Sequence, residues 1–326
     1  MLSVAPMMER TDRHCRYFLK LISPNSWLYT EMITASALTD GGRLDLLKFN
    51  PFEHPVALQL GGSDIEKLSR AAYLGAKAGY DEINLNVGCP SSRVQSGRFG
   101  ASLMAEPATV ASCVRAMARI VDIPITVKTR LGIDNLDSYE FLHEFVGVIS
   151  NAGCRTVMIH ARKALLAGLS PKQNREIPPL NYERVYRLKK DYPSLEIILN
   201  GGLEAEAKVL EVLKHVDGVM LGRQAYNNPC LLGRLDSILF EGSPPVFREN
   251  VLEKYLLYIS RELNAGTPLK IMIRPLFGLY KGCPGSKAWR CFLGELPGGE
   301  QGYELLCEFH QTLLQSRVPP LKLASR

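Results

Sequence analysis

The sequence lacks the features that mark a membrane, secreted or metal-binding chain. It has no run of about 18 apolar residues, so we expect no transmembrane helix. Its first residues lack the charged-then-apolar layout of a signal peptide, so we expect a cytoplasmic protein with no membrane partner. The eight cysteines are scattered and form no C-x-x-C pair. They therefore predict free thiols in a reducing compartment, with neither a disulfide framework nor a metal site.

The sequence also lacks a strong charge of one sign. Of its 326 residues, 46% are hydrophobic and 22% are charged, an ordinary globular composition that excludes general disorder. The net charge is +6, and residues 242–326 hold 11 of the basic but only 7 of the acidic residues. This mild surplus permits a polyanionic partner for the C-terminal part without requiring one.

The chain does contain an alternation of apolar runs and helical patterns. Several runs are continuously apolar, as parallel strands buried on both faces should be. Eight runs are predicted as strands, at residues 2–7, 28–32, 56–62, 82–90, 125–132, 156–162, 196–202 and 218–223. Eight β/α units of this length predict a TIM barrel of class α/β. A doubly wound open sheet is the alternative, but no G-x-G-x-x-G turn follows the first strand.

The C-terminal part has a different character. Gly-Ser-Pro-Pro at residues 242–245 predicts a linker, and four helical patterns follow it, the clearest at residues 248–264. We therefore expect two domains, a catalytic barrel at residues 1–241 and a small all-helical domain at residues 242–326.

Polar or special residues stand at the C-terminal ends of six predicted strands. They are Gln59, Asn86 with Cys89, Lys128, His160, Asn200 and Arg223. In a TIM barrel these ends meet at one mouth, where active sites lie. A single histidine is more often structural and a single lysine is usually solvated, but six on successive strands are hard to explain by packing.

The last two predicted strands end in small residues. Asn200-Gly201-Gly202 ends the seventh strand and Gly222-Arg223 ends the eighth. Both could be ordinary turns, but at these positions of a barrel a phosphate site is favoured, with backbone N–H groups and Arg223 as contacts. Lys128 and His160 would then lie in the middle of the barrel mouth, where a cation could neutralise the electron-rich edge of a reduced flavin.

Three further segments are candidates for the site. Gln59 could hydrogen-bond a pyrimidine-like ring edge, and the Ala5-Pro6-Met7 turn offers a flat apolar face, or is a plain strand end. Cys89, pinned between Gly88 and Pro90, is a candidate acid or nucleophile, or a small buried residue. The basic loop after the sixth strand is either a solvated loop or part of a track for RNA.

Taken together, these segments resemble the tRNA-dihydrouridine synthases, most closely the bacterial A-type subfamily. The most specific segments are INLNVGCPS at residues 83–91 and HARKALLAGLSPKQNREIPPL at residues 160–180. The likeness is dense from Leu2 to about Phe240 and weaker in the tail. The tail has Ile-Arg-Pro at residues 273–275 where the A-type pattern has Arg-His-Met, and Trp-Arg-Cys at residues 289–291 where an Arg-Arg pair follows the Trp. These departures concern the binding of tRNA and the target position, not the flavin site.

The resemblance implies an FMN-bound barrel, a helical tRNA-binding domain, and NADPH-dependent reduction of uridine at positions 20 and 20a of the tRNA D-loop. It implies Cys89 as proton donor, Asn86 and Arg175 as contacts of the uracil nucleotide, and, less directly, Arg162 as a tRNA contact. The implied FMN contacts are Ala5, Pro6, Met7, Gln59, Lys128, His160, Asn200, Gly201, Gly202, Gly222 and Arg223.

Two other functions compete with this one. An FMN barrel acting on a small free pyrimidine would share the flavin contacts but would not need the basic helical tail. An RNA-binding module with a decayed barrel would have lost Cys89, Lys128 or His160, and all three are present. Nothing in the sequence demands more than a monomer.

Overall fold

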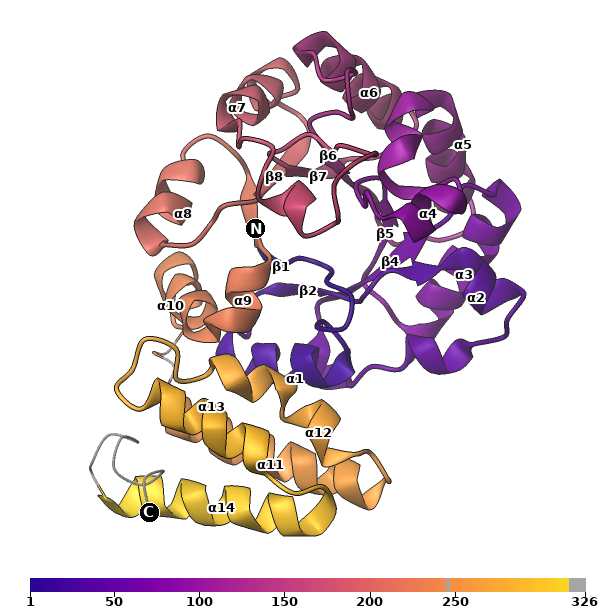
Figure 1. Ribbon diagram of the computed structural model, residues 1–326. Helices are drawn as coiled ribbons and strands as arrows, with labels where there is room; N and C mark the ends of the chain where they lie inside the picture. The colour runs from indigo at the N-terminus through magenta and orange to yellow at the C-terminus, as the bar shows by residue number, and fades with distance from the viewer. Residues whose placement is uncertain (244, 246, 317–326) are drawn as a thin grey trace. The chain divides into compact units, whose positions relative to one another are not determined.

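A closed barrel of parallel strands forms the larger part of the molecule. The computed structural model describes residues 1–243, 245 and 247–316. The sheet runs in the order β2-β1-β9-β8-β7-β6-β5-β4, and β2 also pairs with β4, which closes the barrel (Figure 1). Its strands are β1 (Leu2–Val4), β2 (Trp27–Tyr29), β4 (Val56–Gly61), β5 (Glu82–Asn86), β6 (Ile125–Arg130), β7 (Thr156–His160), β8 (Glu196–Asn200) and β9 (Gly218–Leu221). The predicted TIM barrel is confirmed. The short strand β3 (Ile33–Thr34), which extends the sheet beside β4, was not predicted.

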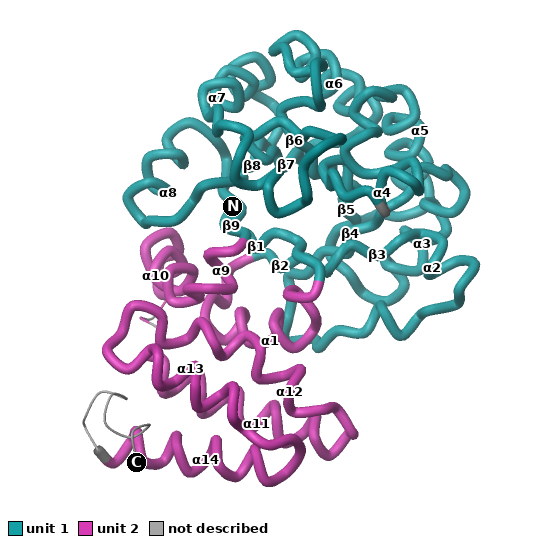
Figure 2. Tube along the Cα trace, viewed as in Figure 1, with its two compact units in different colours: residues 1–8, 27–222 teal, residues 9–26, 223–326 magenta. Residues whose placement is uncertain are grey.

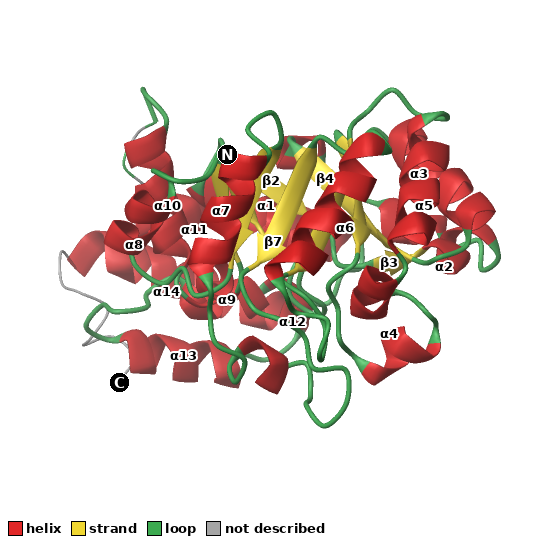
Figure 3. Cartoon of the chain, turned by 90° about the horizontal axis from the view of Figure 1, so that it is seen from above, coloured by secondary structure: helices red, strands yellow, loops and turns green. Residues whose placement is uncertain are grey.

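Helices surround these strands, as Figure 3 shows for α3, α5 and α6. They are α2 (Ala35–Thr39), α3 (Ile65–Ala78), α4 (Ser92–Ser96), α5 (Pro107–Ala118), α6 (Tyr139–Asn151), α7 (Tyr182–Asp191) and α8 (Glu206–Val212). Local chemistry sets their ends. The Asp64 side chain caps α3 by accepting from Lys67 N, Gly79 ends it at φ +99°, and Pro107 opens α5.

The inside of the barrel is filled by side chains. One buried cluster joins Ala5, Tyr29, Ala57, Met158, Ile198 and Met220, which come from six parts of the barrel wall. Glu82 is buried in the same interior, where Tyr29 Oη and Thr126 Oγ1 donate to its Oε1 at 2.9 and 2.5 Å. Burial raises the pKa of Glu82 to about 7. The barrel is therefore a packed core, and access to ligands is at its ends.

The chain divides into two compact units (Figure 2). Unit 1 comprises Met1–Met8 and Trp27–Gly222, and unit 2 comprises Glu9–Ser26 and Arg223–Arg326. The helices of unit 2 are α1 (Arg13–Ile22), α9 (Arg223–Asn227), α10 (Pro229–Leu239), α11 (Arg248–Asn264), α12 (Leu269–Met272), α13 (Ser286–Glu295) and α14 (Gly299–Ser316). The predicted helical C-terminal region is confirmed. The domain boundary at residues 241 and 242 stays a prediction, and Pro244 of the expected linker lies outside the described residues.

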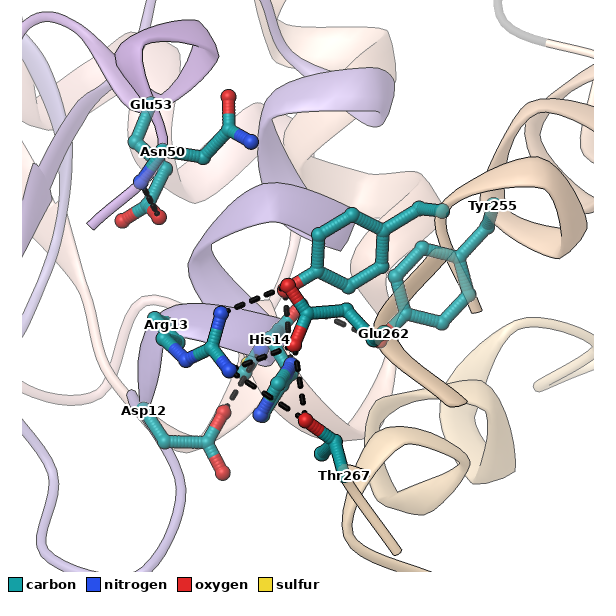
Figure 4. A network of polar contacts seen from close by, with 10 residues as sticks. Asp12, Arg13, His14, Asn50, Glu53, Tyr255, Glu262 and Thr267 are labelled. Atoms are coloured by element: carbon teal, nitrogen blue, oxygen red, sulfur yellow. Dashed lines mark hydrogen bonds and ion pairs between the residues drawn. The ribbon is translucent and has the colours of Figure 1, made fainter. Parts of the chain in front are cut away.

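Unit 2 is held together by aromatic packing and by polar networks. Trp289 is buried, and its Nε1 donates to Leu276 O at 2.8 Å. Figure 4 shows Arg13 of α1 against Glu262 of α11, a bidentate ion pair with N–O distances of 2.7 and 2.5 Å. Thr267 donates to the same carboxylate at 2.9 Å. No helix among the described residues is long and apolar enough to cross a membrane.

Candidate active site at the mouth of the barrel

Strand register places the predicted polar residues in two pairs at the C-terminal ends of neighbouring strands. Asn86 of β5 lies opposite Lys128 of β6, and His160 of β7 lies opposite Asn200 of β8. Neighbouring strands are about 4.8 Å apart. The C-terminal ends of β5 to β8 therefore present these side chains to one site in unit 1, as the sequence predicts.

A chain of buried amides lines one side of this site. Gln59 Nε2 donates to Asn84 Oδ1 at 2.8 Å, and Asn86 Nδ2 donates to Gln59 Oε1 at 2.9 Å. Asn84 in turn donates to Thr126 Oγ1 at 2.8 Å. The structure thus joins Gln59 and Asn86, which the sequence assigns to different ligands. Asn84 was not among the predicted site residues, although its place two residues before Asn86 puts both on one face of β5.

The loop after β5 holds Cys89 by its backbone. Asn86 Oδ1 accepts from Gly88 N at 3.2 Å and from Cys89 N at 3.0 Å. Cys89 O accepts from Ala101 N at 2.9 Å, and a Cβ on Gly100 (φ +74°) would lie 2.6 Å from that oxygen. The Cys89 thiol is half-buried and donates to Ser91 Oγ at 3.7 Å. A thiol fixed in this way can meet a ligand in one defined direction.

The centre of the mouth is cationic. Lys128 Nζ donates to Asn200 Oδ1 at 3.1 Å, and Asn200 Nδ2 donates to Met220 O at 2.7 Å. Burial, together with the charge of Arg130, lowers the pKa of Lys128 to about 7. Burial, followed by the charges of Arg130 and other nearby cations, lowers the pKa of His160 well below its ordinary value. Within the described residues no carboxylate pairs with Lys128, so the site favours an anionic ligand.

The two small-residue turns differ in their need for glycine. Gly201 has φ +107°, and a Cβ there would lie 2.5 Å from His160 Cδ2 and 2.8 Å from Nε2. Gly202 also has positive φ, +68°, and a Cβ would lie 2.9 Å from Tyr182 Oη. A Cβ on Gly222 would meet only Ala5 Cβ at 4.0 Å. Only the turn after β8 therefore requires glycine for the fold itself.

The remaining predicted contacts lie at the ends of neighbouring strands. Ala5, just past β1, is buried, and its N donates to Leu221 O of β9 at 2.8 Å. Pro6 and Met7 are half-buried. Arg223 follows Gly222 directly in the chain but opens α9 and belongs to unit 2. The structure thus places three of these four residues, Ala5, Pro6 and Met7, with the barrel unit.

In the basic loop after β7, Arg175 is exposed, whereas Arg162 makes hydrogen bonds within the loop. Arg175 is exposed at the end of the 3-10 turn Gln173–Arg175. Arg162 donates through Nη1 to Glu176 O and Pro178 O. Both arginines contribute to the low pKa of His160. Arg162 therefore has a structural part in this loop that the sequence did not indicate.

Arg130 was likewise not among the predicted site residues. It stands two residues after Lys128 at the end of β6, so the alternation of side chains along a strand puts both on one face. Arg130 is only 3% exposed, and burial lowers its pKa to about 10. The strand periodicity was the signal that could have added Arg130 to the site.

The donor set of this mouth fits FMN. The cation of Lys128 suits the electron-rich edge of a reduced flavin, and the amide of Gln59 suits a ring edge that offers both donor and acceptor. The turn Gly201-Gly202 has no side chains, so its backbone can approach a phosphate closely. Cys89 and the exposed Arg175 are the side chains that could meet a second ligand.

Comparison with known proteins gives one consistent result. The sequence profile of a protein family described as Dihydrouridine synthase (Dus) matches residues 3–313. The chain is 55% identical over 294 residues to the tRNA-dihydrouridine(20/20a) synthase of Shewanella oneidensis, covering 90% of this chain and 88% of that protein. It is 54% identical over 296 residues to the protein of the same name from Vibrio vulnificus, covering 90% of each chain. The enzyme of that name from Escherichia coli is 53% identical over 298 residues, with 90% and 89% covered.

Proposed function

The chain belongs to the dihydrouridine synthase family and is an oxidoreductase that forms dihydrouridine in tRNA; on that premise we propose that it acts at positions 20 and 20a, with FMN at the barrel mouth and NADPH as the reductant. The observation that carries the proposal is the fixed, half-buried Cys89 thiol at the cationic mouth of the barrel. The relatives named for positions 20 and 20a support the choice of target.

We assign the FMN contacts to the barrel residues that fit such a group. Lys128 and Gln59 would hold the ring system, and the backbone of Gly201 and Gly202 would hold the phosphate. When bound and reduced by NADPH, FMN would supply the hydride for C6 of uracil. The site requires no metal for this chemistry, and we take the monomer in the cytoplasm as the active form.

The protein must first separate the target base from the RNA. A stacked base cannot reach the bottom of a barrel mouth, so the uridine has to be extruded into it. Asn86 and Arg175 would hold the extruded nucleotide. The negative charge that develops at O4 of uracil would be stabilised by the positive charge of the exposed Arg175.

Cys89 would complete the reduction by protonating C5. The thiol S–H bond breaks, a C–H bond forms at C5, and the sulfur is left as a thiolate. Lys128 and Arg130 interact electrostatically with this sulfur, so positive charge lies near the anion that the step creates. The thiol that starts the step is half-buried and is oriented by Ser91. Reprotonation from solvent would restore it for the next turnover.

The test is nucleoside mass analysis of unmodified tRNA incubated with the purified protein, FMN and NADPH. We expect a gain of two hydrogens on uridine that maps to positions 20 and 20a. Transcripts carrying cytidine at one or both positions serve as matched controls and should lose the gain at the substituted position only. A gain at another position would contradict the assigned target but not the reaction.

Two other results would change the assignment. A yellow protein that oxidises NADPH and reduces free pyrimidines but not tRNA would favour the small-pyrimidine alternative. A protein that binds no flavin would remove FMN from the proposal. Size-exclusion chromatography of the FMN-loaded protein tests the monomer separately.

A further inference from the structure

Arg130 connects two loops of the mouth that are far apart in sequence. Its Nε donates to Gly88 O at 2.9 Å, in the loop after β5. Its Nη1 donates to Lys163 O at 3.1 Å and to Asn174 O at 3.0 Å, both in the loop after β7. Strand β6, which carries Arg130, pairs with β5 on one side and β7 on the other. One guanidinium therefore spans both loops from the strand between them.

The carbonyls that Arg130 holds precede the two residues proposed to act on the base. Gly88 O belongs to the peptide group that leads into Cys89, and Asn174 O belongs to the one that leads into Arg175. The N–H of the first peptide group, Cys89 N, donates to Asn86 Oδ1 at 3.0 Å. Both polar ends of the peptide bond before Cys89 are thus fixed by side chains of adjacent strands.

A second side chain ties the same two loops. Gln95 of α4 donates through Nε2 to Pro90 O at 2.9 Å and to Leu166 O at 2.8 Å. Both hydrogens of its amide are used, one for each loop. Pro90 directly follows Cys89, so the chain is held on both sides of the cysteine, by Arg130 before it and by Gln95 after it.

Burying the charged side chain of Arg130 costs free energy that a role in packing alone would not explain. It is 3% exposed, and among the described residues no carboxylate pairs with it, so its charge is balanced only by carbonyl dipoles. An apolar residue of similar volume commonly stabilises a core as well or better. The planar fork of arginine, however, can meet several carbonyls at fixed angles, which no apolar residue can do.

We propose that Arg130, assisted by Gln95, is a positioning residue that fixes the Cys89 thiol relative to Arg175 for protonation of the base. This inference rests on the proposed function. The hydrogen bonds of Arg130 go to the carbonyls of the two loops and not to Gly201 or Gly202, so its effect should fall on the step that uses Cys89. Reduction of the flavin by NADPH does not use that step.

The two half-reactions separate this role from a general structural one. We expect Arg130→Lys to slow reoxidation of the reduced flavin by tRNA about 100-fold, the scale of a misplacement of about 1 Å. Gln95→Leu should slow the same reoxidation about 10-fold, because the hydrogen bonds of Arg130 still connect the two loops. Flavin reduction by NADPH should stay within about twofold of the original rate in both variants. Lysine keeps the positive charge but not the planar guanidinium of arginine. An unchanged rate of flavin reoxidation by tRNA in Arg130→Lys would therefore overturn the proposal.

A double-mutant cycle with Cys89→Ala sharpens the test. If Arg130 acts through the thiol, Arg130→Lys should add almost nothing to the loss already caused by Cys89→Ala. Losses that multiply would contradict the proposal, as would equal slowing of both half-reactions. The matched control is Arg115→Lys on the exposed face of α5, which should change neither half-reaction.

The rate of Cys89 alkylation by iodoacetamide gives a readout that needs no turnover. A thiol released from its fixed loop should react several-fold faster in Gln95→Leu and Arg130→Lys than in the unchanged protein. If Arg130→Lys does not fold, Gln95→Leu decides, and unchanged alkylation and reoxidation rates in it would overturn the inference. If the unchanged protein forms no dihydrouridine, the proposed function fails while the alkylation rates still test the loop ties.

Discussion

Cys89 is held by contacts that do not depend on its own side chain. Its N–H, its carbonyl and the peptide group before it all have partners, and the thiol makes one 3.7 Å contact with Ser91. Truncation of the thiol should therefore leave the loop in place. At this position a loss of activity reports on chemistry and not on folding.

We expect Cys89→Ala to bind FMN as before and to lose most of its turnover on tRNA. The loss should be about 10²- to 10⁴-fold, the usual contribution of a general acid. Flavin absorbance after desalting measures retention, and dihydrouridine formation measures turnover. Near-normal turnover would remove Cys89 from the acid role, and Cys113→Ala, which removes a buried thiol of α5, serves as control.

The lowered pKa of Lys128 predicts how FMN affinity varies with pH. In the free protein Lys128 loses its proton near pH 7, whereas a bound anion favours the charged form. Above pH 7, binding must therefore take up a proton, and the affinity should fall by up to about tenfold per pH unit between pH 7 and 9. Below pH 7 the lysine is charged in both states, so this dependence should vanish.

Lys128→Met is the control for this pH dependence. It should bind FMN more weakly at pH 7 and show a flat affinity between pH 7 and 9, because the titrating group is gone. Quenching of flavin fluorescence on titration with apoprotein measures both. If FMN affinity in Lys128→Met fell with pH as steeply as in the unchanged protein, the proton would be taken up by another group.

At the scale of the element, the turn after β8 and the turn after β9 look alike in sequence but not in structure. Gly201 combines φ +107° with a close approach to His160, while Gly222 leaves room for a Cβ. We expect Gly201→Ala to destabilise the apoprotein by about 1–3 kcal/mol, the range for strained backbone, and Gly222→Ala to change stability little. Thermal unfolding of the two apoproteins measures this directly.

FMN affinity in the same two variants gives independent information. Gly201→Ala should lose affinity, because its Cβ pushes His160 and the backbone out of place. If Gly222→Ala keeps its melting temperature but loses affinity, then its Cβ intrudes on the ligand and the predicted contact of Gly222 is supported. Unchanged affinity in Gly222→Ala would remove that residue from the FMN site.

The elements themselves could be predicted because their signals are local. The eight strands and the helices at residues 65–78 and 139–151 follow from apolar runs and caps within a few residues. The polar residues at the C-terminal ends of the strands can be predicted in the same way. Each is marked by the pattern within its own strand, and the geometry of a parallel barrel brings these ends together. The helical pattern of α1 is local in the same way, but an amphipathic pattern does not say which partner covers the apolar face of the helix.

The ties of Arg130 could not be predicted for a different reason. Its partners are backbone carbonyls 33 to 44 residues away, and every residue type offers a carbonyl. No motif can mark such partners, and only the closed barrel brings them together. The same holds for Gln95, whose second partner, Leu166, lies 71 residues along the chain.

At the scale of the whole molecule, charge-reversal substitutions can test whether unit 2 binds tRNA while the barrel unit carries out the reaction. Arg274 and Arg290 are exposed in unit 2, within the two tail segments that depart from the A-type pattern. If this unit binds the tRNA backbone, Arg274→Glu/Arg290→Glu should raise KM for tRNA about tenfold or more while flavin reduction by NADPH stays unchanged. Each lost phosphate contact should also lower the slope of log affinity against log salt by about 0.7–0.9.

A control of equal charge change isolates the location of the effect. Arg70→Glu/Arg115→Glu alters two exposed arginines on α3 and α5 of the barrel unit and changes the net charge by the same amount. A local tRNA contact predicts that only the unit 2 variant loses affinity. If both variants lose affinity equally, the attraction is a long-range effect of net charge, which screening over about 10 Å at 0.1 M salt should abolish. In that case, the two departures in the tail would have no specific consequence for binding, and the target position would have to be set within the barrel unit.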